Sequence, residues 1–154
     1  MSIAAATDRI EKELVIKAPR SRVWRALSNA GEFGNWFGAK LEDKPFVPGA
    51  RMQGQFTIPG HEHKVLELTV ERVDPETYFS YRWHPCSGNP ADHSNEPPTL
   101  VEFELSEVDG NTLLRLTESG FDSLPAERRA DAFRSNSGGW DFQLQNIARY
   151  AEAQ

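Results

Sequence analysis

The sequence predicts an α+β fold in which a curved antiparallel sheet wraps around a long C-terminal helix, with two short helices after the first strand. Three patterns indicate this fold: polar and apolar residues alternate near the N-terminus, Pro- and Gly-punctuated segments rich in β-formers fill the middle, and an apolar stripe of helical period ends the chain. Strands joined by short turns pair antiparallel. The apolar face of their sheet then needs the helix as its cover.

The first strand is expected over residues 10–18, where Ile10, Lys12, Leu14 and Ile16 share one face. Pro19 ends this strand and suits the first turn of a helix over residues 21–27. A second short helix is expected over residues 32–37, before Gly38.

The middle of the chain contains five further expected strands. They span residues 50–58, 64–73, 78–84, 99–108 and 111–121. The Asp109-Gly110 pair is typical of a tight hairpin turn between the last two. Residues 86–98 break the pattern with thirteen loop-prone residues, and irregular segments of this length are often functional.

The C-terminal region is expected to form helix in two pieces. The first covers residues 125–134, and Ser137-Gly138-Gly139 is expected to interrupt it. An apolar stripe then follows at helical spacing: Trp140, Leu144, Ile147, Ala148 and Ala151. We therefore expect one domain over residues 10–154, preceded by a frayed segment over residues 1–9.

Composition excludes several classes of protein. The 154 residues carry a net charge of −6, which argues against a broad nucleic-acid-binding face. The single cysteine, Cys86, cannot form an internal disulfide framework or a four-cysteine metal site. No apolar run reaches the ~20 residues of a membrane span. With no secretory signal at the N-terminus, the expected location is cytoplasmic, and no cofactor is expected.

Strand alternation directs Phe56, Tyr81, Trp83 and Phe103 toward the interior of the predicted sheet, and further rings approach it from the predicted helices. We expect a cavity at its open end, with these candidate ligand-binding residues: Phe33, Trp36, Phe37, Phe56, Tyr81, Trp83, Phe103, Glu118 and Trp140. Trp36, Trp83 and Trp140 are expected to converge there, whereas Trp24 is assigned to the core. The alternative is that these rings fill a solid core.

Glu118 is the one acid on the inward face of its strand, alongside Leu114 and Leu116. A carboxylate in such a place needs a compensating partner. The candidates are Arg51, Arg82, His63 and His84. The functional alternatives are a ligand-orienting group or a general acid/base, and the structural alternative is a strand end that reaches solvent or an arginine.

The histidines do not form a convincing metal site. His61 and His63 adjoin a Pro-Gly turn, and Cys86 and His93 lie in a loop with no second cysteine. A Cys86–His84 nucleophile and base pair lacks an orienting third group. We therefore assign no metal site, and Glu118 is the one candidate for a catalytic role.

Four stretches, in order, resemble a known family. They are Ile16-Lys17-Ala18-Pro19 through Val23-Trp24-Arg25-Ala26-Leu27; Phe33-Gly34-Asn35-Trp36-Phe37; Pro48-Gly49-Ala50-Arg51; and Glu118-Ser119-Gly120-Phe121 with Gly138-Gly139-Trp140 and Leu144. Together they resemble bacterial homologues of the activator of the heat-shock-protein-90 ATPase, within the START/polyketide-cyclase-like (SRPBCC) superfamily. The resemblance covers residues 10–150.

This resemblance implies the helix-grip fold, also called START-like or birch-pollen-allergen-like, with a hydrophobic ligand cavity. Members of the superfamily include binding proteins, cyclases, hydratases and co-chaperone domains, so the fold alone does not select a function. The leading hypothesis is a binding domain for a small apolar or aromatic ligand. The alternatives are a cyclase- or hydratase-like enzyme that uses Glu118, and a protein-interaction or co-chaperone module with a chaperone partner. Formation of a homodimer is left open.

Overall fold

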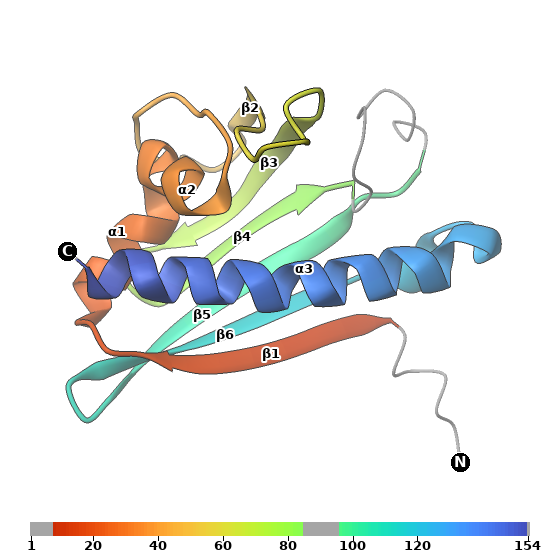
Figure 1. Cartoon of the computed structure of the whole chain (residues 1–154). Coiled ribbons are helices and arrows are strands. Elements are labelled where there is room, and N and C mark those ends of the chain that lie inside the picture. The colour runs from red at the N-terminus through yellow and green to blue at the C-terminus, as the bar shows by residue number, and fades with distance from the viewer. Residues whose placement is uncertain (1–7, 85–95, 154) are drawn as a thin grey trace, which may run out of the picture.

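The computed structural model describes residues 8–84 and 96–153, and it confirms the predicted fold class (Figure 1). In this part of the chain, six antiparallel strands form one sheet in the order β1-β6-β5-β4-β3-β2. The strands are β1 (Arg9–Ile16), β2 (Arg51–Gln55), β3 (Val65–Asp74), β4 (Tyr78–Trp83), β5 (Thr99–Val108) and β6 (Asn111–Ser119). The helices are α1 (Arg20–Ser28), α2 (Ala30–Phe37), the short 3-10 helix η3 (Phe121–Ser123) and α3 (Ala126–Glu152).

The two short helices follow from local signals. Pro19 occupies the N-cap of α1, with an extended backbone that closes β1 and opens the helix. Asn29 then ends α1 and caps α2, because its side chain accepts a hydrogen bond from the Glu32 backbone N–H at 3.0 Å. Gly38 ends α2 with a φ of 93°, in the left-handed region that glycine tolerates. Phe37 is therefore the last helical residue before the chain turns away.

The β5–β6 hairpin determines which residues of these strands face each other. Asp109 and Gly110 have φ values of 53° and 81°, as a type I′ turn requires. The resulting register pairs Val101 with Glu118, and β1 on the other side pairs Ile10 with Glu118. Glu118 is thus flanked by strands on both sides, near the end of β6.

The helix α3 is continuous, and the predicted interruption at Gly138-Gly139 is wrong. Each glycine costs a helix interior up to about 1 kcal/mol relative to alanine. That cost is offset by contacts on both sides of the pair, since the side chains of Asn136 and Trp140 both bind Glu118. Long-range contacts therefore hold the helix through a stretch that local propensity would break.

The core lies between the concave face of the sheet and α3, which runs along that face (Figure 1). The expected alternation in β1 is confirmed, because Ile10 and Ile16 are buried while Val15 is exposed. None of the described helices is long and apolar enough to cross a membrane. Most of the expected 86–98 loop, with Cys86 and His93, falls outside the described residues.

Candidate functional site

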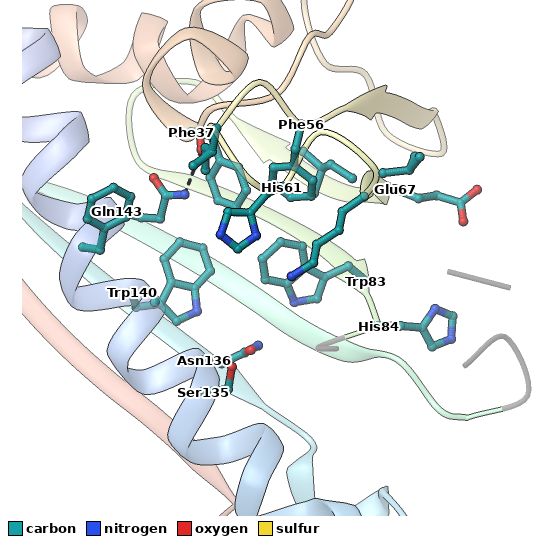
Figure 2. Close-up of a pocket in the computed structure, with 16 residues that line it drawn as sticks. Phe37, Phe56, His61, Glu67, Trp83, His84, Ser135, Asn136, Trp140 and Gln143 are labelled. Carbon is teal, nitrogen blue, oxygen red and sulfur yellow. Dashed lines mark hydrogen bonds between the residues drawn. The ribbon is translucent and has the colours of Figure 1, made fainter. Parts of the chain in front are cut away.

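A pocket of about 480 Å³ lies between α3, the end of α2, the β2–β3 hairpin and the end of β4 (Figure 2). Its volume falls within the usual range for small-molecule sites. The lining residues are Phe37, Phe56, Ile58, His61, Lys64, Val65, Leu66, Glu67, Trp83, His84, Ser135, Asn136, Gly139, Trp140, Phe142 and Gln143. Ser135, Gly139 and Phe142 are exposed, so the pocket opens to solvent along α3.

Four aromatic rings form the inner wall of this pocket. The Phe37 ring centroid lies 6.2 Å from that of Phe56, 5.9 Å from that of Trp83 and 6.1 Å from that of Trp140. The two tryptophan rings lie 5.7 Å apart with their planes 33° from parallel. These separations are typical of interacting aromatic pairs. The wall therefore joins α2, β2–β3, β4 and α3 in one apolar surface.

Behind this wall, the carboxylate of Glu118 is completely buried and accepts hydrogen bonds from four uncharged side chains. Oε2 accepts from Trp83 Nε1 at 2.8 Å and from Thr99 Oγ1 at 2.6 Å. Oε1 accepts from Trp140 Nε1 at 2.8 Å, and Asn136 Nδ2 donates to both oxygens at 3.0 and 3.1 Å. These hydrogen bonds fix the orientation of both indoles.

The predicted cationic partners of Glu118 are wrong. Arg51 pairs with Glu67, Arg82 pairs with Glu71, and His84 bonds the carbonyl of Glu96. His63 is exposed on the β2–β3 turn. These residues belong to strands or faces that the alternation pattern alone could not place relative to Glu118. Uncharged donors, and no ion pair within the described part of the chain, compensate the buried carboxylate.

Glu118 also does not line the pocket, because Trp83, Trp140 and Asn136 separate it from the open space. A general acid or base must lie within hydrogen-bond reach of the reacting group. In this arrangement Glu118 positions the pocket wall and does not contact its contents.

Tyr81 has a buried hydroxyl for which the described residues offer no hydrogen-bond partner. Burial, together with the negative charge of nearby Glu118, raises the pKa of Tyr81 well above the ordinary tyrosine value. Its ring lies 5.3 Å from that of Trp83, on the core side of the wall. Tyr81 therefore remains neutral over the physiological pH range.

The eight aromatic residues of the sequence-predicted site divide into two groups. Phe37, Phe56, Trp83 and Trp140 line the pocket. Phe33, Trp36, Tyr81 and Phe103, however, are buried in the core and do not line this pocket. Their roles as pocket residues are corrected accordingly, and the alternative of a filled core holds for them.

The predicted convergence of three tryptophans holds for two of them. The indole of Trp36 donates to the carbonyl of Ala26 in α1 at 2.8 Å, and Trp36 is not among the residues that line the pocket. Trp24 is only partly buried and packs against the margin of the core. The pocket position expected for Trp36 is wrong because helical periodicity identifies a buried face without identifying its neighbour.

Sequence reasoning missed several polar residues of the site. Asn136 precedes Trp140 by four residues, so both lie on one face of a continuous helix. Because a break was expected at Gly138-Gly139, the sequence did not place Asn136 and Trp140 on the same helix. Gln143 reaches further along α3 and donates to the backbone carbonyl of Phe37 at 2.8 Å, which ties α3 to the end of α2 (Figure 2).

The three histidines in the described part of the chain do not gather at one point. His61 lines the pocket and points from the β2–β3 turn toward Trp140 (Figure 2), while His84 lies at the other side of the opening. Within residues 8–84 and 96–153, no group of three or more His, Cys, Asp or Glu side chains is arranged to hold a metal ion.

Comparison with solved structures shows the same fold in proteins of several bacteria. Protein MLL2253 from Mesorhizobium loti has 26% sequence identity and a TM-score of 0.73, with 95% of this chain and 98% of that chain covered. The Aha1 dimer from Colwellia psychrerythraea has 18% identity and a TM-score of 0.66, with 94% and 96% covered. DynU16, from the dynemicin biosynthetic locus, has 23% identity and a TM-score of 0.70. The match to DynU16 covers 94% of this chain but only 47% of that one.

A search of curated proteins finds no match. A family model, however, matches residues 17–152, which include both short helices, five of the strands and α3. This span contains the whole pocket and the Glu118 network. The chain therefore belongs to the family described as Activator of Hsp90 ATPase homolog 1-like protein.

Proposed function

We propose that this protein binds a small apolar or aromatic molecule in the pocket between α3 and the β2–β3 hairpin. The observation that supports this most directly is the aromatic wall. Phe37, Trp83 and Trp140 present ring surfaces to an open volume of about 480 Å³. Transfer of apolar surface from water onto such a wall contributes about 25 cal/mol per Å².

Preorganisation of the wall supports the same proposal. The indole N–H groups of Trp83 and Trp140 are already bound to Glu118 at 2.8 Å, so their ring orientations are set before any ligand enters. Binding to side chains that are already ordered avoids part of the entropic cost of association. Glu118 then serves as a positioning residue, which favours a binding function over the alternative in which it acts as an acid/base.

The proposal can be tested with N-phenyl-1-naphthylamine, an uncharged dye whose fluorescence rises in apolar surroundings. A Cβ at either Gly138 or Gly139 would meet nothing within 4 Å, yet only Gly139 lines the pocket. Gly139→Leu should therefore fill the site and weaken dye binding at least about tenfold, or ~1.4 kcal/mol. The matched variant Gly138→Leu should bind as the unaltered protein does.

Circular dichroism melting of both variants provides the control for folding. Equal dye binding by Gly138→Leu and Gly139→Leu, with both folded, would place the dye elsewhere. Failure of the unaltered protein to bind the dye would count against the proposed function itself.

A further inference from the structure

The pocket contains a lysine that continues an inward-facing row of β3. Lys64 directly precedes this strand. In the alternation of side chains it falls on the same face as Leu66, Leu68 and Val70, which are at most 3% exposed. Lys64 is itself half-buried and lines the pocket. Its ammonium group is thus attached to a row of side chains that otherwise builds the core.

A second inward lysine, Lys12 on the edge strand β1, provides a comparison because its charge is paired. Lys12 stands in the inward row of β1, with its side chain 21% exposed, and its Nζ lies 2.8 Å from Asp141 Oδ1 on α3. Lys64 has no such partner, because no ion pair or side-chain hydrogen bond joins it to any residue in the described part of the chain. One inward lysine is therefore compensated within the fold, and the other faces the pocket.

The remaining charges around the pocket do not compensate Lys64. Glu67 lines the pocket, but its Oε2 accepts from Arg51 Nε at 2.7 Å. Glu118 is enclosed behind the indoles, with both oxygens occupied. His61 is a second basic side chain on the same wall as Lys64. Over residues 8–84 and 96–153, the uncompensated charge of the pocket is therefore positive.

We infer that the ligand is an organic acid: an apolar or aromatic body that contacts the ring wall, with an anionic group bound by Lys64. This inference rests on the proposed function and specifies its ligand class. A half-buried ammonium interacts more strongly with an anion than it would in water, because solvent screening is reduced there. As a compact point charge on a flexible stem, it can bind a carboxylate, sulfonate or phosphate.

The charge of the ligand can be tested with two dyes of one ring skeleton. N-phenyl-1-naphthylamine is uncharged, and 8-anilinonaphthalene-1-sulfonate carries an added sulfonate. Lys64→Met keeps the apolar stem of the side chain and removes its charge. This variant should bind the sulfonate dye about tenfold more weakly and the uncharged dye within about twofold of the unaltered protein, as loss of one charge contact predicts.

Lys12→Met is the matched control, because it also removes an inward lysine, but on β1 and outside the pocket. It should leave the binding of both dyes unchanged. Equal weakening of both dyes by Lys64→Met, or no weakening of either, would overturn the inference while leaving the pocket as a binding site. Absence of binding by the uncharged dye to the unaltered protein would instead overturn the proposed function on which the inference rests.

Discussion

The two ends of the concave face are built in different ways. Beside α1, which contacts β5 and β6, the space is filled by stacked rings, with Phe79 5.1 Å from Phe46 and 6.1 Å from Phe103. At the other end, beside the β2–β3 hairpin, the rings surround open space, and a buried carboxylate lies behind them. Ring packing fills the first end, whereas hydrogen bonds to Glu118 fix the rings at the second.

This difference explains how a wall can stay ordered when one of its sides has no neighbour. A ring in a filled core is held on every side by van der Waals contact. A ring beside a pocket lacks those contacts on the open side, so another interaction must fix its orientation. At Trp83 and Trp140, the bonds from each indole N–H to Glu118 do so.

The largest expected effect follows from removing the carboxylate at the open end. Glu118→Ala leaves the donors of Thr99 and Trp140 buried without an acceptor, and it removes the acceptor of the half-buried Trp83 and Asn136. We expect the free energy of unfolding to fall by about 3–5 kcal/mol, as measured by urea denaturation. Glu104→Ala, at an exposed position of β5, should change it by less than about 0.5 kcal/mol. Similar losses for the two variants would contradict a stabilising role for the network.

A smaller difference in the free energy of unfolding is expected when leucine is replaced by alanine once at each end. Leu116 is 1% exposed within the packed core, and Leu66 is 3% exposed at the edge of the pocket. Leu116→Ala creates a closed cavity, which should cost about 3–4 kcal/mol of unfolding free energy. Leu66→Ala enlarges space that is already open, so we expect about 2 kcal/mol. Chemical denaturation of both variants measures the difference, and a larger loss for Leu66→Ala would reverse the assignment of the filled and open ends.

The smallest effect at neutral pH concerns Tyr81, between the two ends. Its hydroxyl is buried without a described partner, so Tyr81→Phe should leave the free energy of unfolding at pH 7 unchanged or raise it by up to about 1 kcal/mol. The pKa of Tyr81 is raised, so above pH ~10 the unfolded chain releases this proton and the folded chain keeps it. Stability should therefore fall as pH rises, by up to about 1.4 kcal/mol per pH unit.

Tyr81→Phe should lose less stability than the unaltered protein over this alkaline range. Tyr78 and Tyr150, whose pKa values are also raised by burial, are present in both proteins. Their contributions therefore cancel in the comparison. Denaturation curves at several pH values from 7 to ~11 measure the difference, and parallel losses in the two proteins would show that Tyr81 titrates alike in the folded and unfolded chain.

Much of the fold could be predicted because its signals are local. Alternation placed β1 and its inward row, Pro19 and Gly38 placed the ends of short helices, and Asp109-Gly110 placed the hairpin. The glycine pair in α3 was misread for the same reason. Local propensity favours a break there, but bonds from Asn136 and Trp140 to a distant strand outweigh it.

The site was only partly predictable. Parity placed Trp83 and Glu118 on the inward face, but it could not tell that Trp83 borders open space while Tyr81, two residues earlier, lies in solid core. Lys64 continues the inward face of β3, and Lys12 falls on the inward face of β1. The alternation pattern does not tell that Lys12 forms an ion pair with Asp141, whereas Lys64 faces the pocket. Both differences depend on which side chains of α3 lie opposite each position of the sheet.

The sequence alone therefore determined the order of the elements, the residues that face inward and the presence of one acid among them, because period and turn chemistry act over a few residues. The tertiary structure decided which inward residues surround a pocket and which donors compensate Glu118. Those outcomes depend on the distance and register between α3 and the sheet. They follow from the packing of segments far apart in the chain, and not from any pattern within one of them.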